Sequence, residues 1–183
     1  KKLFYYAQEL LKQVIAEKWI TARAVIGIFE AEAEAETVAL PGTGIEFNFM
    51  RQQAKKSSQA NLCLSDFVAP KGDYLGTFAV TAGIGIEKWI EKFEKDHDDY
   101  HSIMLKALAD RLAEAFAECM HQRVRKEFWG YAANEQLSND ELIREGYQGI
   151  RPAPGYPACP DHTLKPLIWK LLDVEANTGI ILT

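Results

Sequence analysis

The sequence lacks several features that mark large classes of protein. It has only three cysteines, Cys63, Cys119 and Cys159, and this small, odd number argues against a disulfide framework and fits a reducing compartment. No apolar run approaches the roughly 20 residues that a membrane-spanning helix needs, and no signal peptide is recognisable. We therefore expect no membrane insertion and a cytoplasmic location.

Positive charge is also scarce. Lys and Arg total 21 against 26 Asp and Glu, which gives a net charge of −5 and makes nucleic-acid binding an unfavoured function. The 183 residues, of which 48% are hydrophobic, can build one folded domain with its own core. The chain begins at Lys1 rather than Met and ends on an apolar run, so we expect a fragment, incomplete at both ends, without an internal domain boundary.

Common catalytic motifs are missing as well, since the chain has no phosphate-binding loop, dinucleotide-binding glycine pattern or nucleophile elbow. A metal site deserves weighing because His97 and His101 lie four residues apart, and Cys159 and His162 are separated by two residues. Together they could form a tetrahedral zinc site. However, the paired cysteines of structural zinc sites are absent, and Cys159 can serve as a small hydrophobe. We predict neither a metal site nor a catalytic residue.

Apolar residues at spacings of three and four predict helices. They do so over residues 3–19, 98–129 and 164–175. Ser138, followed three residues later by Glu141, has the form of a capping box and predicts the start of another helix.

Short runs rich in β-branched and aromatic residues predict strands. These runs cover residues 23–29, which we expect to be buried on both faces, 62–68 and 74–81. Residues 41–44 contain proline and two glycines and predict a turn, and residues 51–61 form a polar connector for which a helix is one option.

Glutamates alternate with alanines after the first predicted strand, at Glu30, Glu32, Glu34 and Glu36. A period of two places these carboxylates on one side of an extended chain. They could gather a cation, but like charges in a row usually face water.

The most informative stretch is Arg151-Pro-Ala-Pro-Gly-Tyr-Pro-Ala-Cys-Pro-Asp-His162. Its four prolines exclude a helix interior or a central strand and predict a rigid, extended loop. Arg151 offers a planar fork to a carboxylate, Gly155 permits close approach to the backbone, and Tyr156 offers an aromatic face. Ala153 adds a backbone acceptor. A proline-rich crossover whose arginine pairs with a nearby carboxylate is an equally open interpretation.

The predicted helix over residues 98–129 carries a second candidate surface. Asp110 and Glu114 lie four residues apart, and Ala107 and Ala117 share their face, so a bulky partner could approach two carboxylates there. An ordinary exposed helix face is the alternative.

Five segments of the chain together resemble the C-terminal activation domain of cobalamin-dependent methionine synthase. The proline-rich loop resembles the family's signature for binding S-adenosylmethionine, and the further similar segments are residues 61–70, 73–83, 97–118 and 141–147. The resemblance implies a single C-shaped α+β domain with a bent antiparallel sheet flanked by helices.

The resemblance also implies a role in reductive reactivation. During turnover the cobalamin of these enzymes is occasionally oxidised to cob(II)alamin, and an electron together with a methyl group from S-adenosylmethionine restores methylcobalamin. The domain would bind S-adenosylmethionine and dock on the cobalamin-binding domain of the same polypeptide. It would thus be part of a methyltransferase of methionine biosynthesis, although it would not perform the main reaction alone. Because the cofactor carries the chemistry, the family needs no catalytic side chain here.

Carried over by motif position, Arg151 would bind the methionyl carboxylate of S-adenosylmethionine. The backbone of Ala153 and Gly155 and the side chain of Tyr156 would shape the adenosyl pocket.

Glu114 and Glu145 would face the cationic amino or sulfonium end of the same ligand. Asp110, one turn before Glu114, could face the docked cobalamin module. In the family, an aspartate from before Lys1 and a tyrosine-bearing segment from beyond Thr183 also help to build the site.

Flavodoxin or an equivalent reductase is the partner that the family implies as electron donor. Arg123, Arg125 and Lys126 form a candidate basic patch for it, although cations at a helix C-terminus also complement the helix dipole. An alternative of another class is a non-catalytic ligand-binding or protein-interaction module that uses the proline-rich loop as its docking surface.

Overall fold

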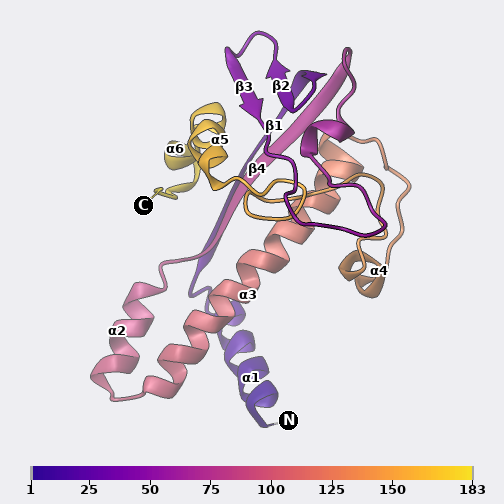
Figure 1. The fold of residues 1–183 in the computed structure, drawn as a ribbon. Helices are drawn as coiled ribbons and strands as arrows, with labels where there is room; N and C mark the ends of the chain where they lie inside the picture. The colour runs from indigo at the N-terminus through magenta and orange to yellow at the C-terminus, as the bar shows by residue number, and fades with distance from the viewer. Residues whose placement is uncertain (1, 183) are drawn as a thin grey trace. The chain divides into compact units, whose positions relative to one another are not determined.

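A computed structural model describes residues 2–182, which contain both helices and strands (Figure 1). The strands are β1 (Thr21–Glu34), β2 (Thr37–Leu40), β3 (Ile45–Asn48) and β4 (Asp73–Ile84). The α-helices are α1 (Lys2–Ala16), α2 (Glu87–Lys95), α3 (Asp99–Arg123), α4 (Asn139–Ile143), α5 (Lys165–Leu172) and α6 (Val174–Thr178). Shorter helical turns are η1 (Leu64–Phe67), η2 (Val124–Phe128) and η3 (His162–Leu164).

The four strands form one sheet in the order β3-β2-β1-β4. β1 and β2 are antiparallel, with Glu34 opposite Thr37, and the two residues between them make a tight turn in which Ala35 adopts φ +53°. β2 and β3 are also antiparallel and flank the turn predicted at residues 41–44. The predicted α+β class with an antiparallel sheet is therefore confirmed.

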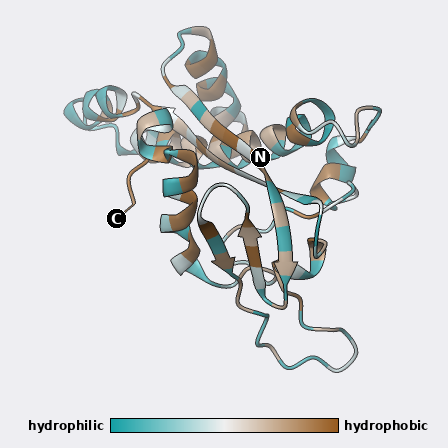
Figure 2. Cartoon of the chain, turned by 90° about the horizontal axis from the view of Figure 1, so that it is seen from above, coloured by the Kyte–Doolittle hydropathy of each residue, from teal (hydrophilic) through white to brown (hydrophobic). Residues whose placement is uncertain are grey.

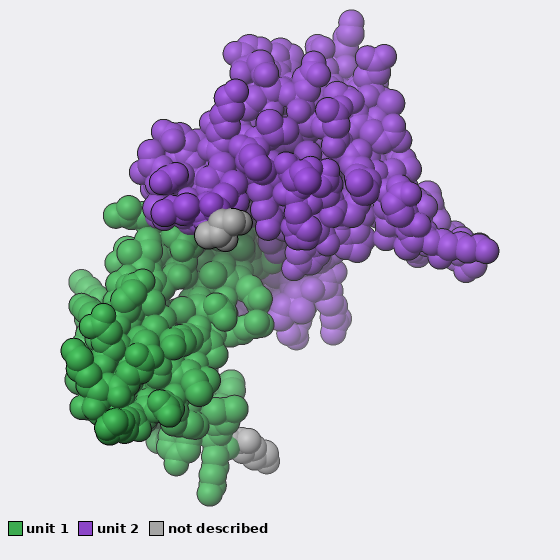
Figure 3. Space-filling model, turned by 60° about the vertical axis from the view of Figure 1, so that its left-hand side comes forward, with its two compact units in different colours: residues 1–24, 79–124 green, residues 25–78, 125–183 purple. Residues whose placement is uncertain are grey.

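Contacts within the chain define two compact units, which are coloured separately in Figure 3. Unit 1 comprises residues 1–24 and 79–124, and unit 2 comprises residues 25–78 and 125–183. Each unit has its own apolar core, and each is described by itself.

Unit 1 is built from α1, α2 and α3. Its core contains Leu10 and Val14 of α1, which lie one helical turn apart, together with Met104 and Leu105 of α3. Trp19 adds a large ring that stacks on Trp89 of α2 with 3.8 Å between ring centroids. The amphipathic helix predicted over residues 3–19 is thus confirmed as α1, although it ends at Ala16.

Unit 2 has its core against one face of the hairpin strands. The buried residues of this core are Ala31, Val38, Leu40, Ile45, Phe47, Phe49, Cys63, Val68, Cys159 and Leu164. Along β3 buried and exposed residues alternate, as the two-residue period of a half-buried strand requires. Figure 2 shows hydrophobic and hydrophilic residues interspersed along the helices and strands, as expected for elements that each bury one side.

The acidic stretch faces solvent as predicted. Glu30, Glu32 and Glu34 are exposed on β1, whereas Ala31 between them is buried. Glu36 lies in the β1–β2 turn, where its carboxylate accepts a hydrogen bond of 3.0 Å from Arg51. The earlier part of β1 corrects one expectation, because residues 24–29 are half-buried rather than buried on both faces.

The strand predicted over residues 62–68 is wrong, because this segment contains the helical turn η1. The Asp66 carboxylate accepts the Cys63 N–H at 2.9 Å, and Arg51 donates to both oxygens of Asp66 at 2.7 and 2.8 Å. These hydrogen bonds, led by those from Arg51, hold the pKa of Asp66 below its ordinary value. The connector over residues 51–61 contains no helix and is tied to this cluster through Arg51.

The long helix predicted over residues 98–129 is confirmed as α3, continued by the π-helical turn η2. Its cap is Asp98, whose carboxylate accepts the His101 N–H at 3.1 Å. The helix predicted over residues 164–175 is interrupted, because Asp173 adopts φ +46° and separates α5 from α6. The pattern did not predict α2. Among the helices of residues 2–182, none combines the length and apolar character that crossing a bilayer requires.

Substitution of one core residue tests the packing of unit 2. Phe47→Ala should lower the free energy of unfolding by about 3–5 kcal/mol, because a large, fully buried ring leaves a cavity. The neighbouring variant Glu46→Ala, at an exposed position of the same strand, should change it by no more than about 0.5 kcal/mol. Urea unfolding of both variants checks this, and equal losses would contradict the described face of β3.

Candidate ligand site on the proline-rich loop

The predicted loop over residues 151–162 consists of two consecutive turns in unit 2. In the first turn the Tyr156 N–H donates to the Ala153 carbonyl at 3.0 Å, with Pro154 and Gly155 at the two central positions. Gly155 has φ +106°. Proline followed by a residue of positive φ is the pattern of a type II turn, so the sequence dictates this geometry locally.

The second turn closes the loop on itself. The Cys159 N–H donates to the Tyr156 carbonyl, and the Gly155 N–H donates back to the Cys159 carbonyl, both at 2.8 Å. Tyr156 and Cys159 accordingly form an isolated antiparallel bridge. Because the Gly155 N–H is used inside the loop, the expectation that the Gly155 backbone contacts a ligand is restricted to its carbonyl group.

Cys159 anchors this loop in the core of unit 2. Its side chain is 3% exposed and lies in the same buried cluster as Cys63 and Leu164. Burial raises the pKa of the Cys159 thiol to about 11, so the thiolate needed for metal binding or nucleophilic attack is disfavoured. Within residues 2–182 no group of three or more His, Cys, Asp and Glu side chains is arranged to hold a metal ion. Two of the three histidines of the zinc interpretation have other contacts, since His101 lies 2.7 Å from Asp98 and the His162 ring packs against Gly155.

Gly155 is fixed by space as well as by backbone conformation. A Cβ atom added there would lie 2.7 Å from Nε2 of His162, which is closer than real Cβ contacts allow. His162 is in turn placed by η3, whose cap Asp161 accepts the Thr163 N–H at 2.8 Å. Any other residue at position 155 would strain the backbone at φ +106° and would require the exposed His162 ring to move.

Of the two side chains predicted to contact the ligand, Tyr156 is exposed on the loop and Arg151 is partly buried. Tyr156 is 63% exposed, so both its ring face and its hydroxyl are accessible, whereas Arg151 is half-buried at the start of the loop. Ala153 is exposed between them. Unit 2 thus gathers Arg151, Ala153, Gly155 and Tyr156 in one short, doubly closed segment.

Glu145, the fifth predicted residue in unit 2, occupies an unusual backbone position. The capping box of Ser138 and Glu141 is confirmed and begins α4. At the other end of α4, the Glu145 N–H donates to Leu142 at 3.0 Å and the Gly146 N–H donates to Glu141 at 2.9 Å, which is the Schellman pattern. Glu145 therefore has φ +57° at a position where glycine is usual. Lys18, His97 and Asp173 also have positive φ, so this conformation by itself indicates a helix end and a cost in free energy at Glu145.

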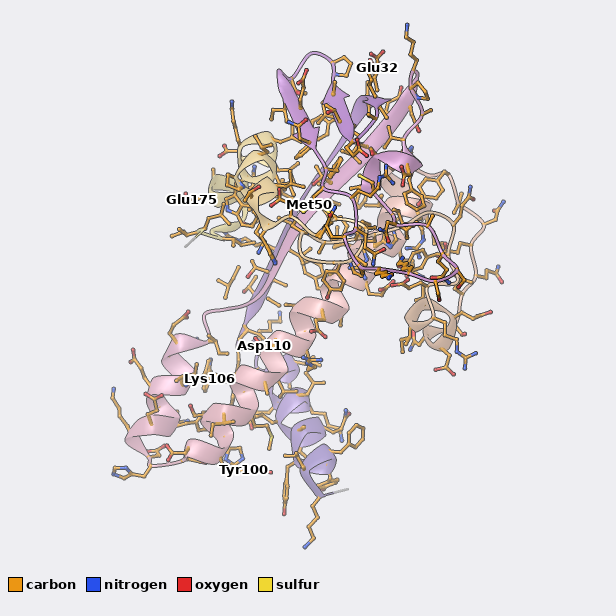
Figure 4. All side chains as sticks on the ribbon, in the orientation of Figure 1. Glu32, Met50, Tyr100, Lys106, Asp110 and Glu175 are labelled. Carbon is orange, nitrogen blue, oxygen red and sulfur yellow. The ribbon has the colours of Figure 1, made fainter. Side chains whose placement is uncertain are left out.

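Glu114, the sixth predicted residue, lies on α3 in unit 1. It is exposed, and its carboxylate is 2.9 Å from Nη1 of Arg111. Asp110 is also exposed on α3, where Figure 4 labels it beside Lys106. The carboxylates of Asp110 and Glu114 are thus accessible from solvent.

A buried cluster next to the predicted residues was not expected from the sequence. Arg125 is fully buried, and its guanidinium donates to both carboxylate oxygens of Glu135 at 2.8 and 2.7 Å. The same guanidinium lies 4.3 Å from the centre of the Tyr147 ring. The prediction that Arg125 belongs to an exposed basic patch is therefore wrong, because Glu135, ten residues away, pairs with it. Nothing in the local spacing indicates this pair.

Comparison with known structures defines the class of domain. A solved structure described as "Crystal Structure of the MetH Reactivation Domain bound to AdoHcy" superimposes with a TM-score of 0.91 at 53% sequence identity. The match covers 100% of this chain and 59% of that chain, so the fold is that of a reactivation domain. The family model described as "Vitamin B12 dependent methionine synthase, activation domain" matches residues 1–183. The chain belongs to this family of activation domains, and the resemblance found in the sequence is confirmed.

Replacement of Gly155 tests the geometry of the loop. Gly42 also has a positive φ, of +82°, but nothing lies within 4 Å of a Cβ added there. Gly42→Ala should therefore cost about 1–2 kcal/mol of unfolding free energy from its backbone conformation alone. Gly155→Ala should cost more, by up to about 1 kcal/mol, because the exposed His162 ring must also move.

Thermal and urea unfolding of both variants measure this difference. Adding His162→Ala to Gly155→Ala should recover the extra loss. Equal losses at the two glycines would contradict the described packing of His162.

Proposed function

We propose that the chain binds S-adenosylmethionine at the loop of residues 151–162 and presents its methyl group to reduced cobalamin held by another domain of the same polypeptide. The observation that carries this proposal is the match to a reactivation domain that was solved with AdoHcy, the demethylated form of that donor. At 53% identity over the whole chain, the two domains share enough residues for a shared ligand site to be expected.

Arg151 is suited to the methionyl carboxylate. Its guanidinium is planar and can donate two parallel hydrogen bonds to a carboxylate, and its partial burial strengthens such a pair relative to one in open water. The loop that follows is closed by backbone hydrogen bonds, so little ordering of the protein is needed on binding.

Tyr156 is suited to the adenosyl group. Its exposed ring offers an aromatic face for stacking, and the neighbouring Gly155 is exposed as well, with the His162 ring packed beside its Cα. The Glu145 carboxylate would favour the cationic amino and sulfonium groups of the donor, and the same role for Glu114 stays a prediction from the family resemblance.

The reaction explains why the chain needs no nucleophile or general base. Reduced cobalamin held by the other domain would supply the nucleophile for the methyl group, and the donor would leave as S-adenosylhomocysteine with the electrons of the broken carbon–sulfur bond. The task of this chain is then to hold the donor by its carboxylate and adenosyl ends, so that the methyl group points at the cobalt.

The wider assignment follows from the family. The chain would act as part of the methyltransferase, in methionine biosynthesis, with the cobalamin-binding domain of the same polypeptide as its direct partner. Asp110 on α3 would face that domain, and flavodoxin or an equivalent reductase would deliver the electron. All three cysteines are free thiols, which supports a reducing, cytoplasmic location.

Removal of the Arg151 guanidinium tests this proposal. Calorimetric titration of S-adenosylmethionine should show binding by the 183-residue chain, and Arg151→Ala should weaken it by about 2–5 kcal/mol because a carboxylate loses its charged partner. Arg144→Ala, which removes a neighbouring exposed arginine, should have little effect. No binding by the unsubstituted chain, together with no displacement by S-adenosylhomocysteine, would favour the protein-interaction module instead.

Replacement of Glu145 by glycine should raise the stability of the fold and lower its affinity for S-adenosylmethionine. Glu145→Gly should raise the free energy of unfolding by about 0.5–1 kcal/mol, because glycine adopts φ +57° without strain, and should weaken S-adenosylmethionine binding. Ala35→Gly relieves the same conformation, φ +53°, in the β1–β2 turn and should gain stability without loss of affinity. Unchanged affinity in Glu145→Gly would remove Glu145 from the site.

A further inference from the structure

We infer that the buried cluster of Arg125, Glu135 and Tyr147, named here the arginine clamp, positions the segment that carries the ligand-binding residues. This inference rests on the proposed function and extends it to residues that would not touch the ligand. Tyr147 lies between Glu145 and Arg151 in the sequence, so its placement governs both of these predicted contacts.

The segment has no regular structure of its own to hold it. Residues 146–153 form neither helix nor strand, although they connect the end of α4 to the proline-rich loop. Side chains from elsewhere in unit 2 must therefore fix their course. Tyr147 is half-buried on the Arg125 guanidinium, and the Tyr131 hydroxyl donates to the Gln148 carbonyl at 3.1 Å. A Cβ added to Gly149 would lie 3.1 Å from the same hydroxyl, so the backbone passes close to Tyr131.

Arg125 is built as a rigid support for Tyr147. Its side chain is 0% exposed and that of Glu135 is 8% exposed, so the pair is removed from water and the two parallel hydrogen bonds orient the guanidinium plane. The Arg125 carbonyl also accepts the Ala132 N–H at 2.9 Å, and the Ala132 carbonyl accepts the Glu135 N–H at 2.9 Å. The backbone and the side chain of Arg125 thus both hold the loop that contains Ala132 and Glu135.

Tyr131, whose hydroxyl donates to the Gln148 carbonyl, is joined to the sheet by aromatic contacts. The Tyr131 ring meets Trp129 edge to face with centroids 5.3 Å apart. Trp129 in turn lies over β4, where a Cβ added to Gly76 would be 3.1 Å from its ring. Backbone hydrogen bonds hold Glu145 and Gly146 to α4, whereas Tyr131 and Trp129 connect the following residues to the sheet through their side chains.

Arginine is required for this role. A guanidinium is planar, so it can bind a carboxylate through two nitrogens at its edge and at the same time stack its face on an aromatic ring. The ammonium group of lysine has no such plane and cannot fix both partners in this arrangement. The clamp thus acts on ligand binding only through the placement of Glu145 and Arg151, as a positioning device.

The test separates positioning from folding by acting on Tyr147. Tyr147→Leu keeps an apolar side chain of moderate size but removes the ring that stacks on Arg125, and Tyr147→Phe restores the ring. Affinity for S-adenosylhomocysteine is measured by calorimetry in the 183-residue chain, the melting temperature by circular dichroism, and amide hydrogen exchange of residues 145–150 without ligand. Arg125→Lys is compared with Arg51→Lys, which changes a second bidentate pair of unit 2.

Positioning predicts that Tyr147→Leu weakens binding roughly tenfold or more and speeds exchange in residues 145–150, while Tyr147→Phe, which keeps the ring on Arg125, loses less affinity than Tyr147→Leu. Arg125→Lys should weaken binding in the same way, and Arg51→Lys should not. Binding by Tyr147→Leu equal to that of the unsubstituted chain, or unchanged exchange in the segment, would overturn the inference alone. No binding by the unsubstituted chain would overturn the proposed function and this inference with it.

Discussion

The hydrogen bonds that join Gly155 and Tyr156 to Cys159 are the constraint on which the candidate site depends. They turn a proline-rich segment into two interlocked turns, and they can form only because Gly155 adopts a conformation that other residues avoid. Cys159 anchors these two turns in the buried core of unit 2. The core that stabilises the sheet and the loop that we propose to hold the donor are therefore parts of one packed structure.

The same logic extends to the segment before the loop. Residues 146–153 have no ladder of backbone hydrogen bonds, and the arginine clamp supplies the missing support from buried side chains. A domain whose chemistry is carried by cofactors needs accurate placement more than reactive groups. The two turns of the loop, the cap at Asp161 and the buried pair of Arg125 and Glu135 agree with this requirement, and burial raises the pKa of the Cys159 thiol and so disfavours the reactive thiolate.

Local features of the chain could be predicted from the sequence, and features that depend on distant partners could not. The rigid loop over residues 151–162 follows from its prolines and glycine, which act on their own backbone. The strand expected over residues 62–68 is wrong because Arg51 pairs with Asp66 and stabilises a helical turn. Arg125 was assigned to an exposed patch for a similar reason, since its partner lies in a later loop. The site residues themselves came from resemblance to a family, because spacing alone left a ligand site and a structural crossover equally open.

The most direct test of the proposed donor site is a nuclear magnetic resonance titration of the isotope-labelled chain with S-adenosylhomocysteine. Proline lacks an amide proton, but Arg151, Ala153, Gly155 and Tyr156 each report on the loop. The account predicts large, saturable shifts at these four amides and at Glu145. Saturable binding with shifts confined to other parts of the chain, or no shifts at ligand concentrations far above those of the protein, would contradict it.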